Sequence, residues 1–189
     1  MPDQNTSEQD LTERFVSGEA VFSGRLLHVR RDTVRLPDGN TATREYIRHP
    51  GAVTVLAFSG EGHVVLERQF RYALERAFIE APAGKVEHDE DLLATAKREL
   101  LEETGYVASD WRRVTTLHNA IGYSDEAIEL FVARGLEKRQ QRLDHEEFLD
   151  VMLVPFAEAL QMVRDGRITD TKTMVALLWM EAFERPTRA

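Results

Sequence analysis

Two short apolar runs constrain most strongly what this chain can fold into. They are "AVTVLAF", residues 52–58, and "HVVLERQ", residues 63–69, and the turn Ser-Gly-Glu-Gly joins them. Apolar runs of this length between glycine-rich turns are typical of β-strands. The pair therefore predicts two consecutive strands and a sheet in the fold.

Strand-like and helix-like segments follow each other without regular alternation. We expect strands within residues 78–87, 112–121, 127–136 and 148–156, and helices over residues 91–104, 156–165 and 170–183. A doubly wound parallel sheet needs regular strand–helix alternation, so this order favours an α+β fold with a sheet between helices. The predicted divisions are a flexible tail at 1–10, an antiparallel β lobe at 11–49 with a turn at Pro37-Asp38-Gly39-Asn40, and a main domain at 50–189.

Composition narrows the classes of function. The formal net charge is -9, which argues against non-specific binding to nucleic acid or to an anionic membrane, because both require a positive surface. The chain has no cysteine, so any metal must take oxygen or imidazole ligands. The acidic N-terminus lacks a signal-peptide pattern, and no apolar segment reaches membrane-spanning length, so we expect a cytoplasmic protein.

The helix expected over residues 91–104 gathers three carboxylates. Its apolar stripe, which we expect to pack on the sheet, consists of Leu93, Ala96, Leu100 and Thr104. Glu99, Glu102 and Glu103 follow at i, i+3 and i+4 on a second stripe beside it, where like charges repel. A hard divalent cation such as Mg²⁺ would offset this repulsion, whereas a solvated acidic face is the alternative for an isolated motif.

The residues around the three glutamates form a longer pattern, "GKVEHDEDLLATAKRELLEETGY", residues 84–106. Its fixed positions are Gly84, Glu90, Arg98, Glu99, Leu100, Glu102, Glu103 and Gly105. This pattern resembles the Nudix box of the Nudix hydrolases, with Tyr106 in a position that is usually aliphatic. The resemblance implies an α/β/α sandwich with a mixed sheet. It also implies hydrolysis of a nucleoside diphosphate linked to another moiety, with Mg²⁺ or Mn²⁺ as the cofactor.

The same resemblance assigns roles to the box residues. Glu99 and Glu103 would be metal ligands together with the backbone carbonyl of Ala83, and Glu102 would be a further ligand or a catalytic orienting group. The remaining box positions are structural: an ion pair between Glu90 and Arg98, and two backbone glycines, Gly84 and Gly105.

Segments on both sides of the box resemble the ADP-ribose and nucleoside diphosphate sugar pyrophosphatase branch. "RQFRYALERAFIEAPAGKVE" implies that Arg71 binds phosphate and that Glu80 belongs to the substrate-binding residues. "GYSDEAIELFVARGL" implies that Glu126 contacts the ribose of the substrate or a metal-bound water. A surface salt bridge is the alternative for Arg71.

The acidic segment "DHEEFLDVMLVP" corresponds to a loop that carries the general base in this branch. Glu147 directly precedes the strand that begins with an aromatic residue, and we expect it to take the proton of the attacking water. Glu146 is the alternative base, and a purely solubilising role is the alternative for both residues.

The β lobe at 11–49 resembles a region that, in this branch, exchanges between the two subunits of a homodimer. Arg44, Tyr46 and Arg48 would then contact the base or the phosphates of a substrate, although Tyr46 could equally be a core residue of a strand. We therefore expect a homodimer.

The substrate implied by the resemblance is ADP-ribose, cleaved to AMP and ribose 5-phosphate. One departure weakens this choice, because Ile121 stands where the branch usually has a proline. Another nucleoside diphosphate sugar, such as a GDP- or UDP-hexose, is the alternative substrate. Sanitation of nucleoside triphosphates and a non-catalytic nucleotide-sugar sensor are the rival functions.

Overall fold

The computed structural model describes residues 10–143, 145 and 147–184 of the chain. Most of the tail expected at residues 1–10, and the alternative base Glu146, therefore lie outside the described residues. Within the described part, no helix combines the length and the apolar character needed to cross a membrane.

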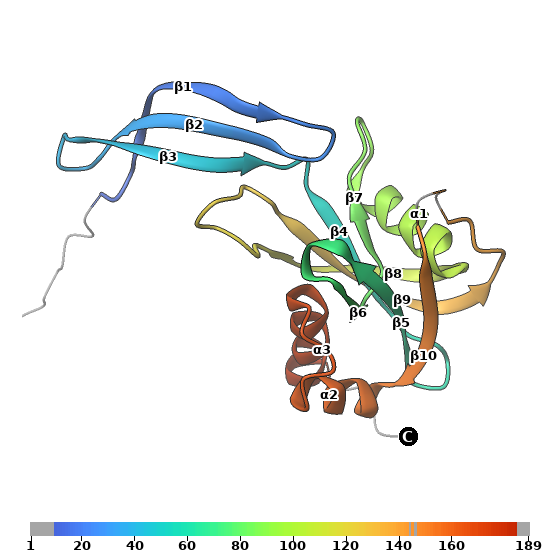
Figure 1. The fold of residues 1–189 in the computed structure, drawn as a ribbon. Helices are drawn as coiled ribbons and strands as arrows, with labels where there is room; N and C mark the ends of the chain where they lie inside the picture. Colours follow the sequence, from blue (N-terminus) through green and yellow to red (C-terminus); the bar gives the residue numbers. More distant parts are fainter. Residues whose placement is uncertain (1–9, 144, 146, 185–189) are drawn as a thin grey trace, which may run out of the picture. The chain divides into compact units, whose positions relative to one another are not determined.

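The chain divides into two compact units, each described here by itself. The first comprises Met1–His49 with Ala120–Asp125, and the second comprises Pro50–Asn119 with Glu126–Ala189. Strands β1 (Arg14–Ser23), β2 (His28–Arg35) and β3 (Thr41–Arg48) form an antiparallel sheet in the first unit (Figure 1). The turn between β2 and β3 contains Gly39 at a φ of 88°, a conformation that favours glycine.

The second unit contains two sheets. The first has the order β7-β4-β9-β8, with bounds Ala83–Lys85, Ala52–Ala57, Ile128–Lys138 and Tyr106–Leu117. Only the β4–β9 pairing is parallel, so this sheet is mixed. The second sheet is antiparallel with the order β10-β5-β6, bounded by Leu149–Pro155, His63–Arg71 and Arg76–Glu80, and a 3₁₀ turn η1 (Tyr72–Leu74) follows β5.

Helices cover the β7-β4-β9-β8 sheet from both sides. Along β4, Val53 and Val55 belong to a core cluster with Leu100 of helix α1 (Leu92–Thr104). Leu56 points the other way, into a cluster with helices α2 (Phe156–Arg164) and α3 (Thr171–Phe183). Because side chains alternate along a strand, β4 is buried on both faces, and the unit is the expected α/β/α sandwich (Figure 1).

The ends of α1 follow from its capping residues. The side chain of Asp91 accepts hydrogen bonds from the backbone N–H groups of Leu93 and Ala94, and Gly105 ends the helix with a φ of 67°. Ala96 and Leu100 are fully buried against the sheet, as the apolar stripe predicted. This packing fixes the direction in which the neighbouring glutamates point.

Candidate functional site

Glu99 and Glu103 lie buried between α1 and β7. Only 4% of Glu103 is exposed, and one of its carboxylate oxygens accepts a hydrogen bond of 3.0 Å from the backbone N–H of Ala83. The carboxylate of Glu99 lies directly over Gly84, where a Cβ atom would stand 1.9 Å from the Glu99 Cδ atom. The backbone of β7 at Ala83 and Gly84 thus lies against both carboxylates.

Arg98 supplies the positive charge among the α1 glutamates. The expected ion pair with Glu90 is present, with nitrogen–oxygen distances of 3.0 and 2.9 Å. The same guanidinium also donates to Glu99 at 2.8 Å and to Glu102 at 3.1 Å, contacts that the sequence interpretation did not include. Arg98 therefore offsets part of the repulsion within the cluster. Its hydrogen bond is the main cause that lowers the pKa of Glu90 to about 2.

Burial and mutual repulsion act on Glu103 and on a further acid, Glu67 of β5. Burial raises the pKa of Glu103, and the negative charges of Glu67 and Glu99 raise it further. Burial, and then the charge of Glu80, likewise raise the pKa of Glu67. The site thus holds more carboxylates than its own cations neutralise.

The character of these residues fits a hard divalent cation. Among the described residues, no three histidine, cysteine, aspartate or glutamate side chains already converge closely enough to hold an ion. The buried Oε2 atom of Glu67 nevertheless has no hydrogen-bond partner in the described part of the chain. Oxygen donors with excess negative charge are the ligands that Mg²⁺ and similar cations take. Glu99 and Glu103 are the residues that could hold such an ion.

Arg71, the expected phosphate ligand, is held by Glu80. Its guanidinium makes a two-pronged ion pair with the Glu80 carboxylate at 2.7 and 2.8 Å, and 43% of the Arg71 side chain is exposed. Glu80 itself is only 2% exposed. The Glu80 carboxylate is thus buried in contacts that orient Arg71, and its expected contact with the substrate stays a prediction.

Lys172 of α3 is a member of this cluster that the sequence interpretation missed. Its ammonium group binds the Glu80 carboxylate and lies 3.1 Å from Asp170. Burial alone would raise the pKa of Glu80, but the hydrogen bond from Arg71 and the charge of Lys172 outweigh burial and hold this pKa below its usual range. A lysine near the start of a predominantly apolar helix was the available signal.

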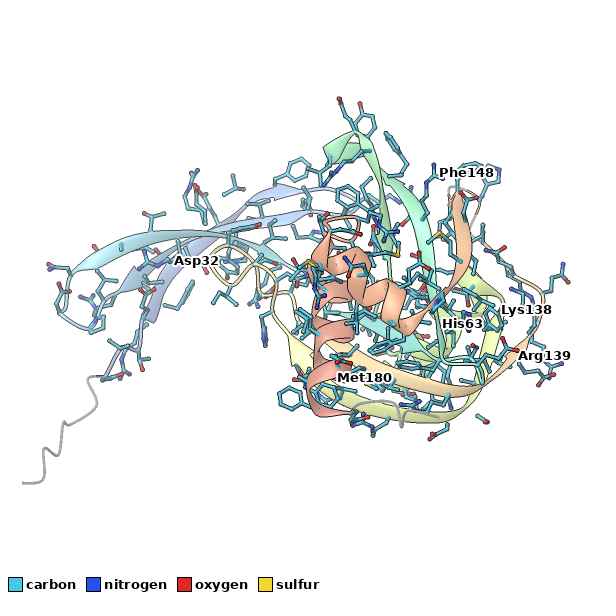
Figure 2. The ribbon with its side chains drawn as sticks, turned by 90° about the horizontal axis from the view of Figure 1, so that it is seen from below. Asp32, His63, Lys138, Arg139, Phe148 and Met180 are labelled. Atoms are coloured by element: carbon cyan, nitrogen blue, oxygen red, sulfur yellow. The ribbon has the colours of Figure 1, made fainter. Side chains whose placement is uncertain are left out.

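Glu147 lies close enough to act on these carboxylates. Its charge is among the causes that raise the pKa of Glu67, Glu99 and Glu103. The residue lines a hollow of about 390 Å³ together with Arg68, Phe70 and other residues of β5, β6 and β10. Figure 2 labels its chain neighbour Phe148, at the point where β10 begins.

The predicted contacts of the β lobe are engaged within the first unit. Arg44 pairs with Glu13, and the Tyr46 hydroxyl donates to Asp32 at 2.8 Å, the residue labelled on β2 in Figure 2. Arg48 donates to Asp125 at 2.8 Å and lies over the Tyr46 ring. Glu126 is partly buried just before β9, in the second unit.

Comparison with known proteins adds to this geometry. Residues 48–177 match the NUDIX domain family, and residues 13–47 match the family described as nucleoside diphosphate sugar hydrolase N-terminal domain. A methanol dehydrogenase activator of Bacillus methanolicus is 41% identical over 174 residues, covering 91% of this chain and 94% of the relative. An ADP-ribose pyrophosphatase of Bacillus subtilis strain 168 is 38% identical over 178 residues, covering 93% and 96%.

Two more matches complete the comparison. A GDP-mannose pyrophosphatase of Salmonella typhimurium strain LT2 is 34% identical over 145 residues, covering 72% of this chain and 75% of the relative. A crystal structure described as an ADP compounds hydrolase superposes with a TM-score of 0.81. It covers 95% of this chain and 100% of the other at 22% identity, which shows a shared fold.

Proposed function

This chain belongs to the Nudix hydrolase family, and we propose that it cleaves the diphosphate of ADP-ribose to AMP and ribose 5-phosphate. The chain is an enzyme of the branch whose relatives are named ADP-ribose and GDP-mannose pyrophosphatases. ADP-ribose is favoured because the ADP-ribose pyrophosphatase match extends over nearly the whole of both chains.

One observation carries this proposal. Carboxylates suited to a divalent cation, and an arginine held in place by Glu80, lie in the second unit close enough to interact electrostatically. The charges of Glu67 and Glu103 act on Arg71, and their effect adds to the hydrogen bond with Glu80 that raises the pKa of Arg71. A diphosphate requires both kinds of group, because its negative charge must be neutralised and its position fixed.

Nudix hydrolases generally depend on a divalent metal, and for this chain we favour Mg²⁺, with Mn²⁺ as the alternative. Glu99 and Glu103 would hold it together with the Ala83 carbonyl, and the half-buried Glu102 follows beside them on α1 as a further ligand or orienting group. A bound divalent cation neutralises phosphate charge and lowers the pKa of water.

The chain's own residues then divide the remaining tasks. Arg71, which Glu80 holds in place, binds and orients the diphosphate. Glu147 accepts the proton of the attacking water, a role supported by its electrostatic effect on Glu99 and Glu103. Glu146 stays the alternative base and lies outside the described residues.

We further propose a cytoplasmic homodimer in which the β lobe serves the partner subunit. The lobe carries large exposed apolar side chains on β1, including Phe15 and Phe22, and such surfaces commonly mark interaction sites. We expect the base or the phosphates of the substrate to be contacted by Arg44, Tyr46 and Arg48, and the ribose or a metal-bound water by Glu126. Size-exclusion chromatography with light scattering tests the dimer, and a monomer at micromolar concentration would refute it.

A comparison of substrates tests the activity. We expect kcat/KM with Mg²⁺ to be highest for ADP-ribose, with AMP and ribose 5-phosphate as products on chromatography. The GDP-mannose pyrophosphatase relative makes GDP-mannose the necessary competitor, and UDP-glucose and the triphosphates complete the panel. A kcat/KM for GDP-mannose about tenfold above that for ADP-ribose, which is about 1.4 kcal/mol of discrimination, would overturn the choice of substrate.

Replacing Gly84 with alanine tests whether the close packing of Gly84 against Glu99 positions that carboxylate. A Cβ atom at this position would stand 1.9 Å from the Glu99 carboxylate, so that carboxylate must move. We expect Gly84→Ala to lower kcat/KM by about 10–100-fold, the usual effect of disturbing a group that orients a metal ligand. The melting temperature should change little, because the displaced atoms end a flexible side chain.

Gly60→Ala is the matched control for this substitution. A Cβ atom at Gly60 would meet no described heavy atom within 4 Å, so this variant should retain full activity. Equal kcat/KM values for the two variants would show that Gly84 does not position Glu99.

A further inference from the structure

Glu67 is a buried acid to which the proposed function has given no role. It lies on β5, the central strand of the β10-β5-β6 sheet, directly opposite Val151 on β10 and Glu80 on β6. The preceding residues, Val64, Val65 and Leu66, are all fully buried. Only 1% of Glu67 is exposed, so a carboxylate occupies a position that packing alone would give to an apolar residue.

The cations next to Glu67 are already committed to another carboxylate. Arg71 and Lys172 both donate hydrogen bonds to the carboxylate of Glu80, which is the cross-strand neighbour of Glu67. In the part of the chain that the structure describes, the Oε2 atom of Glu67 has no hydrogen-bond partner. A buried carboxyl oxygen without a hydrogen-bond partner destabilises a fold whether or not the group is ionised, so its presence points to a compensating role.

The position of Glu67 directs it toward the carboxylates of α1. Cross-strand partners project from the same face of a sheet, so Glu67 lies on the same face as Glu80. Three residues after Glu80, the N–H of Ala83 donates to Glu103. After burial, the charge of Glu67 is the largest cause that raises the pKa of Glu103. Glu67 of β5 therefore lies on the sheet side of the carboxylate cluster, whereas Glu99 and Glu103 belong to helix α1 on its other side.

We propose that Glu67 is a further carboxylate of the cation site, which supplies its unpartnered Oε2 atom to the divalent ion held by Glu99 and Glu103. This inference rests on the metal dependence within the proposed function. It explains why an acid stands in the middle of a buried strand without a hydrogen-bond partner for one oxygen. It also predicts that Glu67 strengthens metal binding while lowering the stability of the metal-free fold.

Metal binding by purified full-length protein, measured without substrate, tests the proposal. Mn²⁺ serves as the probe, and its affinity is measured by isothermal titration calorimetry and by the free-ion signal in electron paramagnetic resonance. We expect Glu67→Gln to weaken Mn²⁺ binding by about tenfold or more relative to the wild type. Glu61→Gln, the same change at an exposed turn residue before β5, is the matched control and should bind Mn²⁺ like the wild type.

Thermal unfolding in EDTA separates this role from a structural one. Glutamine keeps the shape of the side chain and cannot ionise, so Glu67→Gln should melt at the same temperature as the wild type or higher. Wild-type Mn²⁺ affinity in Glu67→Gln, or a lower melting temperature in EDTA, would overturn the proposal. A wild-type protein that binds Mn²⁺ without cleaving ADP-ribose would instead refute the proposed function and leave the binding comparison valid.

Discussion

Glu103→Gln is expected to lower kcat/KM for ADP-ribose about a thousandfold. Glu103 is one of the buried carboxylates proposed to hold the cation, and the hydrogen bond that its carboxylate accepts from the backbone N–H of Ala83 fixes its position. A bound cation contributes several kcal/mol to the stabilisation of phosphate charge, and about 4 kcal/mol corresponds to three factors of ten in rate. Rates are measured at saturating Mg²⁺, so that weaker binding alone does not produce the loss.

The fold should survive this substitution. A glutamine oxygen can still accept the hydrogen bond from Ala83, and removal of the charge relieves the repulsion from Glu67 and Glu99. We therefore expect the melting temperature in EDTA to be unchanged or higher. Glu87→Gln, at an exposed position before α1, is the control and should keep normal turnover. Near-normal turnover of Glu103→Gln would contradict the assigned role.

Lys172→Met is expected to destabilise the protein by about 3 kcal/mol. Lys172 is buried and binds Glu80 and Asp170, so a methionine of similar length leaves two carboxylates with less positive charge nearby. Removing one partner of a buried ion pair typically costs about 3–5 kcal/mol, and here Arg71 still compensates Glu80 in part. The free energy of unfolding is measured by urea titration in EDTA.

Lys97→Met is the matched control for the lysine substitution. Lys97 lies on the exposed side of α1, where the same change should alter the unfolding free energy by no more than about 0.5 kcal/mol. A loss below about 1 kcal/mol for Lys172→Met would show that Arg71 alone satisfies Glu80.

Local patterns predicted the individual elements well. Helix α1 was expected over residues 91–104, and it spans Leu92–Thr104 because Asp91 and Gly105 cap its two ends. The runs 52–58 and 63–69 both contain strands, but these strands belong to different sheets, and an isolated antiparallel bridge pairs Phe58 with Val64. Periodicity reports that a segment is extended, whereas pairing depends on segments far away in the chain.

The functional cluster was predictable only where its spacing is local. The pairing of Glu90 with Arg98 followed from the box, but the additional bonds of Arg98 to Glu99 and Glu102 depend on side-chain conformations within the folded site. Lys172 and Glu80 stand 92 residues apart, so no spacing rule could join them. Glu67 looked like an ordinary strand residue until the fold buried it.

The central claim is that carboxylates of α1 and a divalent cation together cleave ADP-ribose. The most direct measurement is the initial rate of AMP release from ADP-ribose as Mg²⁺ is added back to EDTA-treated protein. We predict no AMP release before addition, a saturable rise with Mg²⁺ for the wild type, and no comparable rise for Glu103→Gln. AMP release that persists in EDTA, or that returns equally in both proteins, would contradict the account.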